Sequence, residues 1–341
     1  MVFSTIPTAS LRRGPAQYST FIVSKKPLIT HLFTADPSAH VFEGKIYLYP
    51  SHDLDVAAEE NDFGDQYAMT DYHVFSQAHP EAPATDHGEA LHLRDVSWAS
   101  KQMWAPDAAY ANGRYYLFFP ARDRAGVFRI GVATAMRPEG PFVPEPAPIA
   151  GSFSIDPCVF RDRDGSFYLY FGGLWGGQLQ CWRGAGFDPK GVEPAAAESA
   201  LNPRVAKLSP DLLSFEGPVQ QVVIQDEAGL PLKSGDHERR YFEGPWVHQH
   251  NGLYYFSYST GNTHTLVYGT SPSPLGPFAF RGRILNPVIG WTTHHSIVEH
   301  GGRWWLYYHD ASLSGGQSHK RCVKVQELFY AADGSIVTMD A

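Results

Sequence analysis

The stretch from Asp36 to Tyr49 decides the fold, and it reads DPSAHVFEGKIYLY. A short apolar run leads into a polar turn that ends at Gly44, and an aromatic strand follows. Glycine adopts the positive φ of a tight hairpin turn, and aromatic side chains suit a pleated surface that is half buried. The stretch therefore predicts a β-hairpin.

The same pattern recurs four more times along the chain, so the hairpin is a repeat. Aromatic residues anchor the second strands of the five copies: Tyr47, Tyr116, Tyr168, Tyr255 and Trp305. Hairpin repeats of about 40–50 residues are typical of β-propellers, in which each copy forms a four-stranded blade. The sequence predicts an all-β fold, a five-bladed β-propeller in a single domain over residues 31–341. Residues 1–30 are expected to form a lead-in that packs on the propeller.

A polar group stands just before each hairpin: Asp36, Asp107, Asp156, Glu243, and His294 with His295. The innermost strand of every propeller blade lines the central channel, so equivalent ends of five strands meet at one mouth. A polar residue that only ends a strand would explain a single copy. Five ordered copies favour the convergence of several carboxylates and two histidines on one axis.

The composition indicates which kinds of binding partner and which cellular compartment suit the protein. A net charge of −8 disfavours nucleic acid and anionic membrane surfaces and leaves neutral substrates open. The three cysteines follow no disulfide motif. No stretch reaches the length of a membrane span, and no signal-peptide run follows Arg12 and Arg13. These features predict a soluble, cytoplasmic protein.

The segment 51–71 is rich in acidic residues and irregular in pattern. It lacks the ligand spacing and the central glycine of an EF-hand loop, which favours a solvated loop over a calcium site. A second use remains open, because such a loop could form a rim over the mouth of the channel.

The converging acids suit the hydrolysis of a glycosidic bond. This reaction needs one carboxylic acid to protonate the leaving oxygen and one carboxylate to activate water or attack directly. Acids from different blades that face each other across a channel favour the wider separation, which leaves room for a water. A third carboxylate nearby would raise the pKa of the acid by like-charge repulsion.

The chain resembles glycoside hydrolase family 43 in five motifs that occur in order: Asp36-Pro37-Ser38, Met103-Trp104-Ala105-Pro106-Asp107, Ile155-Asp156-Pro157, Phe242-Glu243-Gly244-Pro245-Trp246 and His294-His295-Ser296. The family comprises five-bladed propellers that act by inversion as β-xylosidases, α-L-arabinofuranosidases and arabinanases. The resemblance covers residues 31–338, and the motifs at 49–53 and 290–298 look most like the β-xylosidase branch. The chain ends with the fifth predicted blade, so no appended β-sandwich is expected.

The resemblance implies a role for each motif residue. Asp36 would be the general base, Asp156 the modulator of pKa, and Glu243 the general acid. The substrate-binding residues would be Trp104, His295 and Arg321. His294 would contact a divalent cation in the channel, calcium in this family, and no organic cofactor is implied. Asp107 is interpreted as a structural residue.

These residues together predict an inverting exo-glycosidase, a β-1,4-D-xylosidase acting on neutral xylo-oligosaccharides. An α-L-arabinofuranosidase or a bifunctional enzyme acting on arabino-oligosaccharides is the alternative within the class. A non-catalytic carbohydrate-binding propeller is the alternative outside it. A retaining enzyme of the fructosidase type is disfavoured, since its motif places Asn before Asp-Pro and this chain has Ala35 there.

Overall fold

The computed structural model describes residues 25–57, 59–261 and 265–341. Most of the predicted lead-in, residues 1–24, lies outside the described residues. Within the described ranges the chain is built from strands, and its helices are short 3-10 turns: η1 (Leu93–Asp95), η2 (Trp175–Gly177), η3 (Leu179–Trp182) and η4 (Ser312–Ser314).

The strands form five sheets, each made mainly from one continuous part of the chain. Blade one contains β1 (Phe33–Phe42), β2 (Lys45–Asp53), β3 (Asp71–Gln77) and β4 (Thr85–His92). Blade two contains β5 (Ala99–Lys101), β6 (Asp107–Ala111), β7 (Arg114–Asp123), β8 (Phe128–Ala135) and β9 (Val143–Pro144). Blade three contains β10 (Cys158–Arg161), β11 (Phe167–Phe171), β12 (Arg204–Lys207) and β13 (Gln220–Gln221).

Blade four contains β15 (Tyr241–His250), β16 (Leu253–Thr260), β17 (Leu266–Ser271) and β18 (Phe278–Leu285). A short strand from the preceding connection, β14 (Ile224–Gln225), pairs in parallel with the outer edge of β18. Blade five contains β19 (His295–His300), β20 (Arg303–Asp310) and β21 (Cys322–Leu328).

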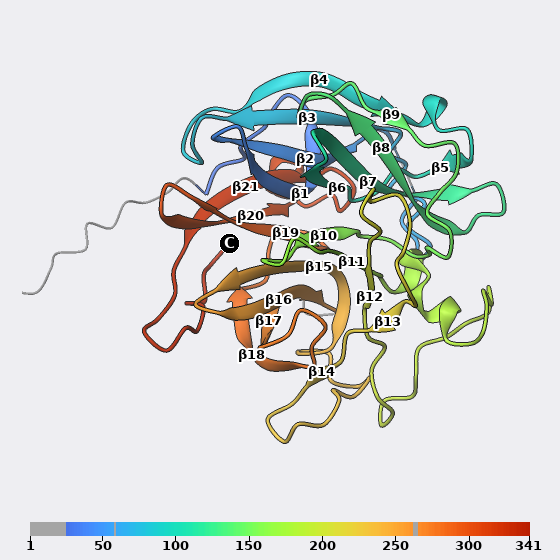
Figure 1. Ribbon diagram of the computed structural model, residues 1–341, viewed down its shortest axis with the longest axis vertical. Helices are drawn as coiled ribbons and strands as arrows, with labels where there is room; N and C mark the ends of the chain where they lie inside the picture. The colour runs from blue at the N-terminus through green and yellow to red at the C-terminus, as the bar shows by residue number, and fades with distance from the viewer. Residues whose placement is uncertain (1–24, 58, 262–264) are drawn as a thin grey trace, which may run out of the picture.

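The first strands of the five hairpins form the inner ring. Strand β1 contacts β6, β6 contacts β10, β10 contacts β15, β15 contacts β19, and β19 contacts β1 again. Figure 1 shows these strands around the middle of the molecule, with the outer strands of each blade farther away. The predicted five-bladed propeller is therefore confirmed.

Four of the five hairpins close through the turn that the sequence predicts. In the first, Phe42 pairs with Lys45, and the two residues between them both have positive φ, 53° at Glu43 and 74° at Gly44. The pairs 112–113, 251–252 and 301–302 repeat this conformation. Positive φ at both central residues defines the type I′ turn, whose twist matches that of the flanking strands. The third hairpin has a longer turn, in which Asp162 N–H donates to the carbonyl of Ser166.

The blades pack face to face through aromatic and aliphatic side chains. The largest buried cluster joins blades three, four and five and includes Tyr170, Phe256, Tyr258 and Leu306. The cysteines Cys158, Cys181 and Cys322 are all free and buried, as their lack of a motif predicts.

Both ends of the described chain attach to the last blades. Leu28 N–H donates to the carbonyl of Val323 in β21, and Ile29 is buried beside Trp305 and Tyr307 of blade five. At the other end Met339 forms an isolated β-bridge with Leu285 of blade four.

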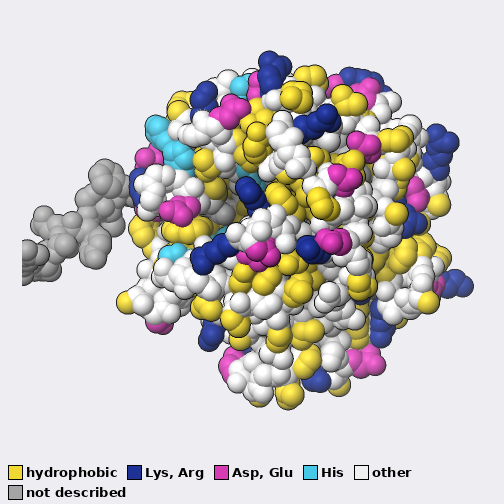
Figure 2. Space-filling view, viewed as in Figure 1, with side chains coloured by type: hydrophobic (Ala, Val, Ile, Leu, Met, Phe, Trp, Pro, Cys, Tyr) yellow, Lys and Arg dark blue, Asp and Glu magenta, His cyan; other side chains and the backbone are white. Residues whose placement is uncertain are grey.

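In the part of the chain that the structure describes, no helix has the length and apolar character needed to cross a bilayer. On the face drawn in Figure 2, Lys and Arg side chains are scattered among Asp and Glu and form no single basic patch.

Candidate active site

Irregular backbone at the ends of the inner strands places the three predicted acids. Asp36 lies where the register of β1 shifts, between Ala35 and Ser38, and Glu243 lies at a similar shift in β15. Asp36 has φ 50° and Asp156, just before β10, has φ 57°. Bulges and left-handed residues re-aim side chains at functional sites, and each strained residue costs about 1–3 kcal/mol.

Asp36, Asp156 and Glu243 line one small inner cavity of about 50 Å³, together with His294 and Arg321. An outer cleft of about 330 Å³ adjoins it. Glu243, Trp104, Tyr67 and Thr292 line both spaces, so they stand at the junction. The structure thus brings the three carboxyl groups together on the channel axis.

Asp36 is held as a carboxylate. Its Oδ1 accepts from Arg321 at 3.0 Å and its Oδ2 from Ser51 at 2.6 Å, while its backbone N–H donates to His309 Nδ1 at 2.9 Å. Burial alone would raise its pKa, but the charge of Arg321 and the neighbouring imidazoles of His294 and His309 outweigh burial and hold the pKa well below 3.8. An ionised Asp36 can accept a proton.

Arg321 owes its position to Asp53, a residue that sequence reasoning did not place in the site. The guanidinium donates to both oxygens of Asp53 at 2.8 Å, and the backbone N–H of Arg321 donates to the same carboxylate. Asp53 and Arg321 are 2% and 5% exposed, so the pair is shielded from water. Asp53 ends the motif at 49–53, which was noted only for its resemblance to a family branch.

Asp156 and Glu243 have the opposite electrostatic environment. Asp156 accepts from the backbone N–H of Gly244 at 2.9 Å, which ties the two acid-bearing segments together. Burial raises the pKa of both carboxyls above their ordinary values of 3.8 and 4.5. For Glu243 the neighbouring charge of Asp156 raises the pKa further, so Glu243 is the group that keeps a proton. Two acids with pKa values pushed apart are the arrangement that acid–base catalysis requires.

Trp104 and His294 lie where the sequence predicts, in the walls of the cavities. Trp104 donates from its indole nitrogen to the carbonyl of Tyr67 at 2.8 Å and is 8% exposed. The Nδ1 atom of His294 lies 3.6 Å from Asp36 Oδ1, and nearby carboxylates raise the pKa of the imidazole despite its burial. The ring also packs on Gly244, where an added Cβ would lie 2.9 Å from it.

His295 does not lie where the sequence interpretation places it. Its side chain is 1% exposed, lines neither cavity, and bonds through Nε2 to Ser257 in β16 at 2.6 Å. Burial and neighbouring imidazoles hold its pKa well below 6.5, so the ring is neutral. The predicted contact with a sugar is corrected to a contact between the inner strand of blade five and the second strand of blade four.

Asp107 lies away from the cavities and braces three inner strands. It accepts from Ser38 and from the backbone N–H of Val159, and it contacts His40 Nε2 at 2.6 Å. These contacts agree with its interpretation as a structural residue.

The acidic segment 51–71 forms part of the rim of the outer cleft. Glu60, Asn61 and Asp62 line the cleft, and Glu60 accepts from Ser318 of blade five at 2.7 Å. Of the uses left open by the sequence, the rim is the one that this geometry supports. An aromatic part of the wall was not predicted, and there Trp175 of η2 stacks on Trp291 with 5.8 Å between ring centroids.

A model of the glycosyl hydrolases family 43 matches residues 25–336. The chain belongs to this family. Among the relatives of family 43, a xylosidase/arabinosidase of Humicola insolens is 58% identical over 92% of this chain and 98% of its own. A β-xylosidase of Xylanibacter ruminicola is 48% identical over 90% of this chain and 97% of its own.

Solved structures of family 43 show the same fold. A β-xylosidase/α-arabinofuranosidase from a compost microbial metagenome, solved with xylotriose in a calcium-free form, is 56% identical with a TM-score of 0.91. The match covers 92% of this chain and 97% of that one. A Xanthomonas citri enzyme solved with xylotriose is also 56% identical, with a TM-score of 0.88, over 92% of this chain and 93% of its own. The resemblance noted in the motifs is confirmed, and the chain is a glycoside hydrolase.

Proposed function

We propose that this family 43 enzyme is an inverting exo-glycosidase that releases terminal D-xylose from β-1,4-linked xylo-oligosaccharides. One observation carries the proposal: an ionised Asp36 and a protonated Glu243 line the same small cavity, and only Glu243 of the two also lines the outer cleft. The relatives named xylosidase/arabinosidase and β-xylosidase support xylose as the sugar that is released.

The two cavities assign positions to the parts of the substrate. The terminal sugar occupies the inner cavity and the remaining chain occupies the outer cleft, so the scissile oxygen lies beside Glu243. Asp36 takes a proton from a water that attacks the anomeric carbon, while Glu243 gives its proton to the departing oxygen. Asp156 keeps Glu243 protonated until that step by adding negative charge nearby.

The size of the inner cavity supports exo-action. Its volume of about 50 Å³ is small beside the 330 Å³ of the outer cleft, and Ile155, Met69 and Ala105 line its walls. A chain end can enter such a space, whereas the middle of a polymer would need an open groove on both sides. Neutral oligosaccharides also suit a protein of net charge −8 with no large basic patch on the face of Figure 2.

The channel fits a bound calcium ion. The carboxyl groups of Asp36, Asp156 and Glu243 line the inner cavity together with His294, and a divalent cation among them would offset carboxylate charge that burial makes unfavourable. His294 would hold the ion, with water completing the oxygen ligands that calcium prefers. When bound, the ion would supply positive charge that orients the carboxylates, whereas the proton transfers belong to Asp36 and Glu243.

Activity on α-L-arabinofuranosides is the second candidate, favoured by the double names of two relatives. The ratio of kcat/KM for p-nitrophenyl β-D-xylopyranoside to that for p-nitrophenyl α-L-arabinofuranoside decides between a xylosidase and a bifunctional enzyme. A propeller that only binds carbohydrate would hydrolyse neither substrate, and its affinity for xylotriose would survive Glu243→Gln.

Proton NMR of the first-formed product tests the mechanism. Inversion at a β-xyloside yields α-xylose before mutarotation, and it requires carboxyl groups roughly 6.5–9.5 Å apart to admit water. Initial β-xylose would show a covalent intermediate and would overturn the assignment of Asp36 as a base.

A further inference from the structure

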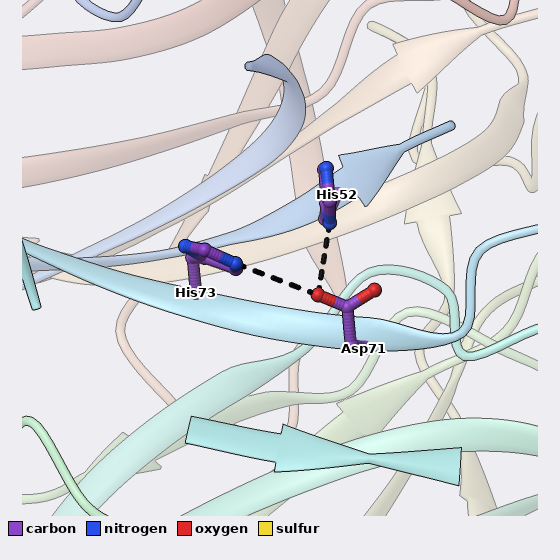
Figure 3. A group of neighbouring side chains, drawn as sticks. All are labelled: His52, Asp71 and His73. Carbon is purple, nitrogen blue, oxygen red and sulfur yellow. Dashed lines mark hydrogen bonds and ion pairs between the residues drawn. The ribbon is translucent and has the colours of Figure 1, made fainter. Parts of the chain in front are cut away.

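A cluster of two histidines and one aspartate lies in blade one, outside both cavities of the active site. His52 comes from β2, and Asp71 and His73 come from the neighbouring strand β3. One ligand atom from each residue lies within 4.8 Å of the other two. Figure 3 shows both imidazole rings directed at the carboxylate of Asp71.

The spacing of these atoms is close to that of a metal site. His52 Nδ1 lies 2.9 Å and His73 Nε2 lies 3.7 Å from Asp71 Oδ2. Tetrahedral zinc, with bonds of about 2.0–2.2 Å to nitrogen and oxygen, places two of its ligand atoms about 3.3 Å apart. The two observed separations bracket this value. At the shorter one His52 Nδ1 donates a hydrogen bond to the Asp71 carboxylate, so an ion would replace that proton and need only small side-chain movements.

A second carboxylate, that of Asp86, contacts His73 and orients its ring. Asp86 in β4 lies 3.1 Å from His73 Nδ1, and the same carboxylate lies 2.8 Å from His31 Nε2. An ionised carboxylate only accepts hydrogen bonds, so His73 donates from Nδ1 and its Nε2 lone pair faces Asp71. A histidine held in this way by a carboxylate is the usual partner arrangement of a metal ligand, where it fixes the tautomer and the ring orientation.

We propose that His52, Asp71 and His73 bind a divalent transition-metal ion of the zinc class. Two imidazole nitrogens and one carboxylate oxygen suit zinc, whereas calcium takes six to eight oxygen ligands. The side chains of His52, Asp71 and His73 are 17%, 8% and 20% exposed, so an ion can enter and a water can supply the fourth ligand.

The site has a structural consequence for catalysis. His52 immediately precedes Asp53 at the end of β2, and Asp53 holds Arg321 against Asp36. An ion that joins His52 to β3 would fix this end of β2. It therefore acts as a brace for the general base and takes no part in the reaction.

Cobalt(II) is the probe that tests the proposal, because its visible absorption reports the number and geometry of its ligands. Tag-free protein is treated with a chelator, dialysed and titrated with Co²⁺ in the presence of calcium, which occupies sites made of oxygen ligands. The expected result is one bound Co²⁺ per chain with an intense visible absorption band, which disappears when an equivalent of Zn²⁺ displaces the cobalt. Absence of saturable binding at micromolar Co²⁺ would overturn the proposal.

Variants locate the ion. His73→Ala should abolish the band, and Asp86→Asn, which leaves all three ligands in place, should weaken binding about 10–100-fold. His79→Ala, an exposed histidine in the same blade, is the matched control and should leave the band unchanged. His294→Ala, which alters the inner cavity of the active site, should also leave the Co²⁺ band unchanged. A band that survives His73→Ala, or one that disappears in His294→Ala, would place the ion elsewhere and refute the site.

Discussion

Replacement of Arg321 by Met removes the cation that keeps Asp36 ionised. The guanidinium donates to Asp36 at 3.0 Å, and burial otherwise raises the pKa of this carboxyl. Two unit charges about 4 Å apart interact by about 4 kcal/mol at an effective dielectric constant of 20. At about 1.4 kcal/mol per pKa unit this gives an upper limit of about 3 units. Because His294 and the Ser51 hydroxyl remain, we expect the pKa of Asp36 to rise by about 1–2 units.

The direction in which the pH profile of kcat/KM moves follows from the role of Asp36 as a base. A base with a raised pKa is protonated at higher pH, so the acid limb of kcat/KM should move upward by the same amount. The assay uses p-nitrophenyl β-D-xylopyranoside, whose leaving group needs little protonation, across the acid range. A fall in kcat/KM with an unmoved acid limb would show that Arg321 acts on the substrate alone and would refute this account.

The same variant should also unfold more easily. It leaves Asp53 and Asp36 buried without the guanidinium that bonds to both, and breaking a buried ion pair costs about 3–5 kcal/mol. The control is Arg303→Met, which removes a cation that is 41% exposed and paired with Glu327 on the surface. Such pairs contribute about 0–1 kcal/mol, so urea unfolding followed by tryptophan fluorescence should separate the two variants clearly. Equal losses would contradict the buried character of the Arg321 pair.

Three further changes test the acid and its surroundings. Glu243→Gln should lower kcat/KM by about 10²–10⁴-fold on xylobiose and far less on p-nitrophenyl β-D-xylopyranoside; equal losses would argue against a proton donor. Asp156→Asn removes a negative charge that raises the pKa of Glu243, so the alkaline limb of kcat/KM should move to lower pH by about one unit, and an upward shift would contradict the pairing. Gly244→Ala places a Cβ at φ 66° and 2.9 Å from the His294 ring. It should lower the free energy of unfolding in urea by at least about 1–2 kcal/mol and also lower kcat. Unchanged stability and kcat would show that the His294 ring moves aside without cost.

The sequence predicted those parts of the molecule that depend on local pattern. Glycine at the turns and aromatic residues in the second strands predicted the hairpins, and their repetition predicted the ring. Because every inner strand begins at the same mouth, the order of Asp36, Asp156 and Glu243 was enough to predict that they meet. The structure adds the electrostatic difference between Asp36 and Glu243 that spacing alone could not supply.

The site residues that the sequence did not predict are held in place by contacts between distant parts of the chain. Asp53 and Arg321 are 268 residues apart in sequence, and no periodicity links them. The aromatic wall at Trp175 lies in a short 3-10 turn, where no strand pattern applies. The misplacement of His295 follows from the strand boundary, because His295 is the first residue of β19 and bonds to β16, whereas His294 lies just before the strand and lines the inner cavity.

The attachment of the two chain ends also bears on how long the enzyme survives. Leu28 holds blade five from one side of the seam, and Met339 joins the far end of the chain to blade four. A propeller ring that opens between blades five and one exposes the faces of both blades. The Leu28 contact spans this boundary, and the Met339 contact holds the chain end that follows blade five against blade four. Deletion of residues 337–341 should therefore shorten the half-life at elevated temperature while kcat stays the same. The contacts at the chain ends thus contribute to resistance to heat without touching the active site.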